Sequence, residues 1–541
     1  MEPKTETSHD EKPVKTVPDE PAPVTGEAKQ AQVLSVALHN ALVQDQISPW
    51  SWTQVRMYAI MALTTLNCCM NGYDSSLMGS LNAMETFHDY FNVPMQGTST
   101  GLMFSIYAIG NLGGAAVAAP ASDTFGRRFG MSIGSAFIIV GTILEAAAKN
   151  LPQFEGGRFL IGFGVSLANT AGPIYLVEMA YPHWRGTFGG LYNVVGYYVG
   201  ALACTWISYG TGFLTSNWSW RAPTVIQAVP SVIVLGCAWM MPESPRWLYA
   251  NNKQEQARRV LVKYHGGGNE DSALVKYECA EIEQDVEFEI ETGGRRWWDY
   301  RVLFSSKEML HRLWLLFLVC VFVLFIGGAV ISYYMPVMLE NAGITDSHQQ
   351  LLMNAINVVL SFVSGIVGSF FVDRWGRRTL FLVGTFLTGL IYVPINVIAS
   401  LSNEHITPSV GYGFIACIFL YGIFFSFCWT PLQALYPAEI LPNRVRGKGM
   451  AFQVLLAGAA NFINLYATTI GLKRIGWKMY TIFLVFHILE FIFMWFTLPE
   501  TKGRSIEELE ELFVQKNPVK ASLAKKNVVV RKGEGVKMME E

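Results

Sequence analysis

The sequence predicts an all-α membrane protein with twelve transmembrane helices in two six-helix, pseudo-symmetric halves, and with amphipathic helices on the cytoplasmic side. Of its 541 residues, 51% are apolar and 15% are charged, whereas roughly a quarter of the residues in a soluble domain are charged. The mean hydropathy is positive, at +0.29. Three charged motifs also occur twice, in the same order. Such a chain cannot cover its surface with charge, so most of it is expected to lie in lipid.

Twelve apolar segments are close to the ~20 residues that a helix needs to cross a bilayer. The first six are 52–77, 101–121, 130–148, 154–179, 187–209 and 222–241. The second six are 311–337, 351–372, 380–400, 411–435, 450–471 and 478–498. We therefore assign residues 51–241 to the N-terminal half and residues 311–498 to the C-terminal half.

Three polar regions flank and connect the halves. Residues 1–50 are rich in Pro, Glu, Lys and Thr, which predicts a disordered cytoplasmic tail. In the linker 242–310, apolar residues from Val275 to Ile290 follow a 3.6-residue period, which is typical of an amphipathic helix. In the C-terminal region 499–541, Ser505 and Glu508 form a predicted capping box, and Leu509 and Phe513 share one face of the helix that follows.

The distribution of Lys and Arg in the short connections predicts the orientation. Connections with Arg127, Arg377 and Arg446 are basic. The connections around Glu85, Asp346 and Glu404 contain neither Lys nor Arg. Because cytoplasmic connections carry the excess of positive charge, both termini are expected in the cytoplasm, and the plasma membrane is the expected location. Asn217 begins an Asn-Trp-Ser sequon in an outside connection, which predicts a glycosylation site there.

An internal repeat relates the two halves. Its three motif pairs are Asp123-Thr-Phe-Gly-Arg127-Arg128 and Asp373-Arg-Trp-Gly-Arg377-Arg378, Tyr175-Leu-Val-Glu178 with Arg185 and Tyr436-Pro-Ala-Glu439 with Arg446, and Pro242-Glu243 and Pro499-Glu500. The shared order and spacing predict halves related by an axis along the membrane normal, as in parallel-repeat transporters.

Other function classes find little support. A net charge of −2 argues against a nucleic-acid partner, because such binding needs clustered basic surface. No Cys or His spacing indicates a metal site, and neither a nucleophile–base pair nor a P-loop is found. We expect no cofactor, no enzymatic activity and no ATP-driven step.

The charged motifs lie at the predicted cytoplasmic face. Partly exposed ion pairs are worth only ~0 to 1 kcal/mol each, so several of them can form and break together. We predict that they form an inner gate clasp, whose pairs only the closed inner face satisfies; the alternative is that the arginines merely anchor the topology. The predicted gate residues are Asp123, Arg127, Arg128, Glu178, Arg185, Glu243, Arg246, Asp373, Arg377, Arg378, Glu439, Arg446 and Glu500.

These motifs resemble those of the sugar porter family of the major facilitator superfamily, over residues from about Trp52 to Phe513. The resemblance also includes Gly72-Tyr-Asp74, Gly157-Arg158 and the Pro-Glu-Ser-Pro-Arg and Pro-Glu-Thr-Lys-Gly signatures. Leu191-Tyr-Asn193 and the segment 429–437 are most similar to the fungal lactose and cellodextrin permeases. The resemblance implies the major facilitator fold, transport by alternating access and a monomeric carrier in the lipid bilayer.

The resemblance makes Asp74 the proton site of a sugar symporter and Arg158 its conformation-dependent partner. An ionisable residue inside the membrane is a functional candidate, since burying its charge costs at least ~2.5 kcal/mol. The alternative is a permanent structural ion pair. Glu145, His487 and Glu490 are also predicted within the membrane, and for them we expect structural roles.

Sugar contacts are sought among amides and aromatic rings near the middle of the membrane, because hydroxyl groups both donate and accept hydrogen bonds. The candidates are Asn193, Tyr333, Tyr334, Asn357, Trp429, Gln433 and Asn461. The family's seventh helix normally carries two Gln and one Asn before the paired tyrosines, where this chain has Val323, Leu324 and Ala329.

The expected substrates are therefore a sugar, such as the disaccharides lactose or cellobiose, and protons. The alternative is a sugar-sensing receptor on a transporter scaffold, with little or no flux.

Overall fold

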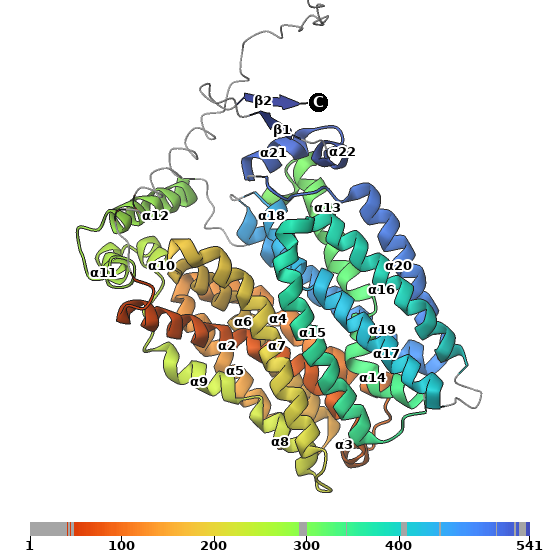
Figure 1. The fold of residues 1–541 in the computed structure, drawn as a ribbon. Helices are drawn as coiled ribbons and strands as arrows, with labels where there is room; N and C mark the ends of the chain where they lie inside the picture. Colours follow the sequence, from red (N-terminus) through yellow and green to blue (C-terminus); the bar gives the residue numbers. More distant parts are fainter. Residues whose placement is uncertain are drawn as a thin grey trace, which may run out of the picture.

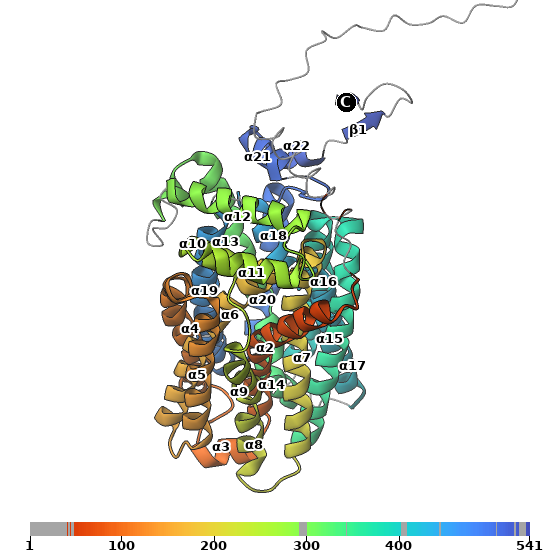
Figure 2. The ribbon, with the colours of Figure 1, turned by 90° about the vertical axis from the view of Figure 1, so that its left-hand side faces the viewer.

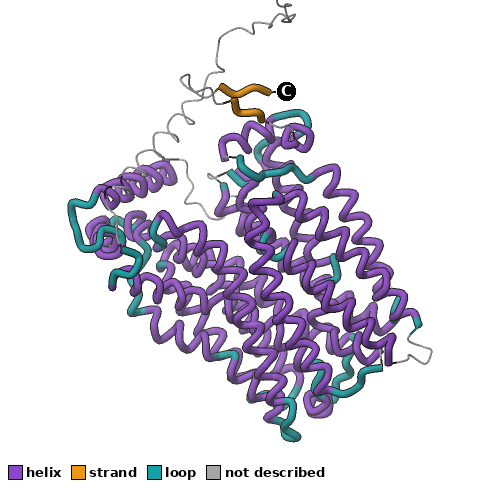
Figure 3. Tube along the Cα trace, in the orientation of Figure 1, coloured by secondary structure: helices purple, strands orange, loops and turns teal. Residues whose placement is uncertain are grey.

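Long helices make up nearly all of the computed structural model, which describes residues 41, 44, 48–291, 300–341, 343–401, 408–442, 445–504, 506–523, 526–529 and 537–540 (Figures 1 and 3). The predicted tail, residues 1–50, lies almost entirely outside the described residues. Ten helices of the described part are long and apolar enough to cross a membrane. Two more, α2 and α7, are 30 and 27 residues long but carry more polar side chains.

The predicted spans are confirmed as helices or helix pairs. The N-terminal half contains α2 (Trp52–Leu81), α4 (Thr98–Phe125), α5 (Arg127–Ala146), α6 (Leu151–Met179), α7 (Arg185–Thr211) and the pair α8 (Trp218–Ile226) and α9 (Val229–Ala238), with the short α3 (Glu85–Phe91) and η1 (Pro182–Trp184). The C-terminal half contains the pair α13 (Lys307–Phe325) and α14 (Gly328–Asn341), then α15 (Ser347–Trp375), α16 (Arg377–Ser400), the pair α17 (Pro408–Cys428) and α18 (Leu432–Ile440), α19 (Arg446–Ile475) and α20 (Lys478–Thr497).

The described parts of the linker and of the C-terminal region both lie at one end of the molecule (Figures 1 and 2). They form α10 (Pro245–Ala250), α11 (Gln254–Tyr264), α12 (Ala273–Glu291), η2 (Arg301–Phe304), α21 (Ile506–Val514), α22 (Pro518–Leu523) and the antiparallel strands β1 (Lys526–Val529) and β2 (Lys537–Glu540). We call this the linker end, and the opposite end, with α3 and the start of α8, the far end.

The two amphipathic helices are confirmed. Val275 and Val286 of α12 are buried, as are Leu509 and Phe513 of α21. Ser505, the first residue of the predicted capping box, lies outside the described residues. These helices therefore pack their apolar faces against the protein at the linker end.

The seventh span, expected as one helix, is broken between α13 and α14. Gly327 stands at the break with φ +91°, a left-handed conformation that favours glycine. The break frees backbone carbonyl groups, which lipid cannot satisfy. The Tyr421 hydroxyl donates to the Ile326 carbonyl at 2.7 Å, and the Asn464 amide donates to the Leu324 carbonyl at 2.6 Å. Side chains of α17 and α19 thus stabilise the break.

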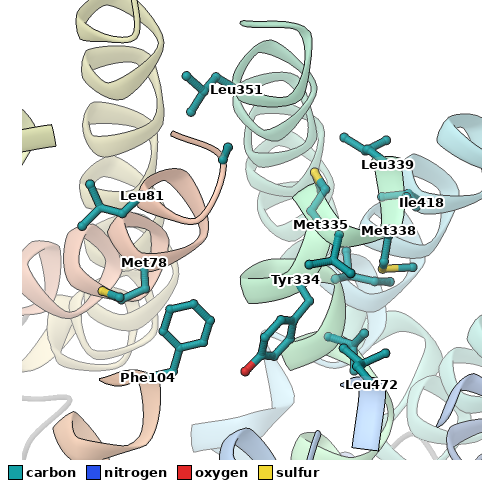
Figure 4. Packing of buried hydrophobic residues seen from close by; sticks show 14 of the residues in the cluster. Met78, Leu81, Phe104, Tyr334, Met335, Met338, Leu339, Leu351, Ile418 and Leu472 are labelled. Carbon is teal, nitrogen blue, oxygen red and sulfur yellow. The ribbon is translucent and has the colours of Figure 1, made fainter. Parts of the chain in front are cut away.

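The halves hold each other mainly toward the far end. There Phe104 of α4 faces Tyr334 of α14, with ring centroids 5.3 Å apart, inside a buried apolar cluster (Figure 4). Hydrogen bonds join Ser80 to Asn354 at 3.3 Å and, at the middle of α7, Tyr198 to Ser426 at 2.7 Å. At the linker end no ion pair between described residues joins the halves. The structure is therefore closed at the far end.

The glycine at the break predicts a sharp difference between two neighbours. A Cβ on Gly327 would lie 2.4 Å from the Tyr392 hydroxyl, and left-handed backbone strains any other residue, so Gly327→Ala should cost about 1–3 kcal/mol. A Cβ on Gly328 would lie 3.5 Å from Phe425, so Gly328→Ala should change stability by less than about 0.5 kcal/mol. Thermal unfolding of the purified variants tests this. Equal stability of the two would contradict the role of the break.

Candidate functional site

A buried ion pair joins α2 and α6 inside the N-terminal half. Arg158 Nη1 donates a hydrogen bond to Asp74 Oδ1, and each side chain is only 1% exposed. A Cβ on Gly72 would lie 1.8 Å from the Tyr197 carbonyl oxygen, so α2 and α7 touch backbone to backbone beside Asp74. The carboxylate therefore has a cation on one side and close-packed backbone near it.

The pair is incompletely satisfied. The Arg158 guanidinium lies over the Tyr107 ring, 5.2 Å from its centroid, and the Tyr107 hydroxyl donates to Asn71 Oδ1 at 3.3 Å. Asp74 Oδ2 and Arg158 Nε have no hydrogen-bond partner among the described residues. One carboxylate oxygen is thus available to hold a proton.

A second carboxylate lies in the same electrostatic environment. Glu145 of α5 is fully buried, interacts electrostatically with Arg158 and Asp74, and accepts a hydrogen bond from the Gln227 amide at 2.7 Å. A Cβ on Gly157 would lie 2.8 Å from the Glu145 backbone nitrogen, so a glycine permits this close approach. Arg158 therefore interacts with two acids.

Polar side chains of both halves meet near this pair. Ser75 lies beside the hydroxyl groups of Tyr197 and Tyr333. The Tyr334 hydroxyl instead bonds to the Thr469 hydroxyl, and its ring is completely buried in the apolar cluster at the far end. Of the two predicted tyrosines, only Tyr333 is placed beside the polar groups of the N-terminal half.

Asn193 lies on the side of α7 that faces the interior. The exposed apolar residues Leu191, Val199 and Trp206 mark the lipid-facing side of this helix. Helical spacing places Asn193 and Tyr197 together on the opposite side. The Asn193 side chain is exposed, whereas Tyr197, one turn closer to the far end, is half-buried. The inner face of α7 becomes more accessible toward the linker end.

The remaining predicted contacts are dispersed in the C-terminal half. Asn357 is 8% exposed, and its Oδ1 lies 2.5 Å from where a Cβ on Gly422 of α17 would stand. Trp429 is completely buried against Phe381, with ring centroids 4.8 Å apart. Gln433 and Asn461 are half-buried. These residues do not form one cluster with Asp74.

The structure adds polar residues that the sequence analysis did not select. They are Asn71, Ser75, Tyr107, Asn111 and Tyr197, close to the buried pair or to Tyr333. Asn71 and Ser75 lie within one turn of Asp74, and Tyr107 and Asn111 are four residues apart. Polar residues at helical spacing in an apolar span are the signal that could have identified them.

The charged motifs form one compact network in each half. In the N-terminal half, Arg127 donates to both oxygens of Glu178 at 3.2 Å and to Asp123 at 2.9 Å. Its backbone N–H donates to Glu243 at 3.1 Å, and the Ser244 hydroxyl donates to Glu178 at 2.5 Å. The Glu243 carboxylate thus lies at the N-terminus of α5, where the positive end of the helix dipole stabilises its negative charge. Burial raises the pKa of this carboxyl above its ordinary value.

The C-terminal half repeats this network. Arg377 donates to Glu439 at 2.7 Å and to Asp373 at 2.8 Å, and its backbone N–H donates to Glu500 at 2.8 Å. The Thr501 hydroxyl takes the place of the Ser244 hydroxyl and donates to Glu439 at 2.5 Å. The internal repeat in the sequence is therefore a repeat of contacts.

Other gate residues bind backbone or the linker. Arg128 donates to the Met241 carbonyl at 2.7 Å, and Arg378 donates to the carbonyls of Leu498 and Trp495. Arg185 pairs with Glu278 of α12 at 3.1 Å, and Arg246 pairs with Asp285 at 3.5 Å. The Arg446 side chain lies outside the described part of the chain.

These contacts correct one expectation. The pairs were expected to be satisfied only when the inner face closes, but they form within each half, between the N-terminal half and the linker, or within the linker. The physical reason is that Arg127 and Arg377 have their acids on neighbouring helices of their own half, and Arg185 and Arg246 have theirs on α12. No contact across the halves is needed to satisfy them.

Asn217 is exposed in the connection between α7 and α8, at the far end, and the Ser219 hydroxyl of its sequon bonds to Thr86 at 2.6 Å. Within the described residues, no group of three or more His, Cys, Asp or Glu side chains is arranged to hold a metal ion.

Two acids that share Arg127 should differ in their contribution to stability. Glu178 is 11% exposed and Asp123 is 59% exposed. Glu178→Ala leaves a mostly buried guanidinium without its main partner and should cost about 2 kcal/mol or more. Asp123→Ala removes an exposed pair and should cost less than about 1 kcal/mol. Chemical denaturation of both variants provides the comparison, and a larger loss for Asp123→Ala would refute this ranking.

Comparison with known proteins places this architecture in a family. The family model described as "Sugar (and other) transporter" matches residues 59–513. A high-affinity glucose transporter of Kluyveromyces lactis is 28% identical over 85% of this chain and 86% of its own length. A quinate permease of Emericella nidulans is 28% identical over 88% of this chain and 92% of its own length.

Solved structures show the same fold. The xylose transporter XylE from E. coli, in a partially occluded inward-open conformation, aligns with a TM-score of 0.69 at 22% identity and covers 83% of this chain and 99% of its own. XylE bound to 6-bromo-6-deoxy-D-glucose aligns with a TM-score of 0.68 at 24% identity, over 85% of this chain. The extent of the family match shows that the chain belongs to the sugar porter family of the major facilitator superfamily, whose members are membrane transporters rather than enzymes.

Proposed function

We propose that this protein is a proton-coupled sugar symporter that works by alternating access in the plasma membrane, with its linker end and both termini in the cytoplasm. The observation that carries the proposal is the buried Asp74–Arg158 pair, in which Asp74 Oδ2 has no hydrogen-bond partner among the described residues. A carboxyl group held in this way can exchange a proton with water when the site opens.

Arg158 would control the proton. When it contacts Asp74 it favours the carboxylate, and when it moves away, desolvation favours the protonated acid. Glu145 offers the guanidinium a second acid to interact with once Asp74 is neutral. The membrane potential can drive the cycle, because one proton moved inward yields ~2.3 kcal/mol per 100 mV.

For the substrate, we propose a disaccharide such as cellobiose or lactose. The seventh span has apolar residues where the family carries amides, and Val323 packs against the apolar cluster of the C-terminal half. Around the Asp74–Arg158 pair, polar groups lie on α2, α4 and α7 of the N-terminal half, with Tyr333 opposite. Such a one-sided surface suits a long ligand better than a small hexose enclosed by both halves.

Because the seventh span is apolar, a sugar-sensing receptor is the second candidate function. A receptor would bind sugar without substantial flux, and uptake by proteoliposomes distinguishes the two functions. We expect labelled cellobiose or lactose to enter faster than glucose, with unlabelled disaccharide as the stronger competitor. Saturable binding without uptake of any sugar would favour the receptor. Faster uptake of glucose would overturn the disaccharide assignment.

The proton site is tested by removing its charge. Asp74→Asn cannot carry a proton, so we expect at least a tenfold loss of sugar accumulation driven by a pH gradient, while exchange down the sugar gradient persists. Asp89→Asn, on an exposed residue of α3, is the matched control and should accumulate normally. If Asp74→Asn accumulates sugar like the wild type, the assignment is wrong. If both activities are lost together with the folded protein, the pair is structural.

A further inference from the structure

Glu490 is a buried acid that the proposed mechanism does not use. It lies on the membrane-spanning α20 of the C-terminal half and is 0% exposed. Neither of its carboxylate oxygens has a hydrogen-bond partner among the described residues. Glu145, which is also 0% exposed, receives a hydrogen bond from Gln227. An ionised carboxylate without any partner is very costly inside a membrane.

His487 lies one turn before Glu490 on the same face of α20. Its Nδ1 is 2.8 Å from the Phe483 carbonyl oxygen, which can only accept a hydrogen bond, so Nδ1 carries the proton of the ring. Its Nε2 is buried and has no partner among the described residues. A neutral His487 therefore offers a lone pair at Nε2, and Glu490 is the next acid along the same face of α20.

In the described part of the chain, the surroundings of this pair contain phenols but no cation. From α16, the Tyr392 ring lies 5.1 Å from the His487 ring, and from α17, Tyr421 interacts electrostatically with Glu490. Tyr480 is the remaining titratable group of α20 in this region. The arginines of α16 are engaged with Glu439 and with backbone carbonyls at the linker end. Among the described residues, no charged side chain compensates a charge on Glu490.

We propose that Glu490 and His487 form a second proton-binding site, in the C-terminal half, that holds one proton as the carboxylic acid of Glu490. The proton comes from water, and its binding converts the carboxylate to the neutral acid without any other change in bonding. The acid can then donate a hydrogen bond to His487 Nε2, which gives a partner to Nε2 and to one of the two Glu490 oxygens.

The two tyrosines near this site also contact the break in the seventh span. The Tyr392 hydroxyl is 2.4 Å from where a Cβ on Gly327 would stand, and the Tyr421 hydroxyl donates to the Ile326 carbonyl. Loss of the proton would place a negative charge near the Tyr421 phenol. Whether Glu490 holds its proton therefore affects the conformation of the break between α13 and α14.

Infrared spectroscopy of the purified full-length protein reads the acid directly and does not depend on transport. At neutral pH we expect a carboxylic C=O stretching band that Glu490→Gln loses. The matched control is Glu340→Gln, because Glu340 is exposed to solvent at the end of α14. A difference spectrum between wild type and Glu490→Gln that contains only carboxylate bands would overturn the proposal.

A second variant tests the partner. His487→Phe keeps a ring of similar size and removes the acceptor, so the Glu490 acid band should move to higher wavenumber. An unchanged band position would overturn the pairing with His487. Because Asp74 lies in the other half, failure of this proposal leaves the assignment of Asp74 untouched.

Discussion

Burial of charge in lipid is the constraint on which the rest of the structure depends. Asp74 and Arg158 can stay in the membrane only because they contact each other, and that contact requires α2 and α6 to keep their register. Glycines provide the close approach around the pair: Gly72 of α2 touches the backbone of α7, and Gly157 of α6 touches the backbone of α5. The close packing of the N-terminal helices is therefore what allows the buried pair to form.

The two ends of the molecule are stabilised in different ways. At the far end, apolar packing between Phe104 and Tyr334 and hydrogen bonds such as Ser80–Asn354 connect the halves. At the linker end, the arginine networks tie together helices of the same half. Each half is thus held together by its own ion pairs at the linker end, while the contacts between the halves are concentrated toward the far end. Such an arrangement suits rigid-body movement of one half against the other.

The sequence predicts the spans well, because twelve apolar segments of membrane length have few other solutions. It also pairs Asp74 with Arg158, since a buried acid and a buried cation at similar depth need each other. It does not predict the break at Gly327, which depends on Tyr421 and Asn464 reaching across from distant helices. Nor does it show that Arg127 and Arg377 find their acids within their own halves, because spacing along the chain does not reveal which helices are neighbours.

The central claim is that sugar and protons cross the membrane together through the site at Asp74. The most direct test adds a disaccharide to weakly buffered, de-energised proteoliposomes that contain the wild-type protein and follows the external pH. The account predicts that the medium becomes alkaline as sugar enters, with about one proton taken up per sugar. Sugar entry without any change in external pH would contradict it.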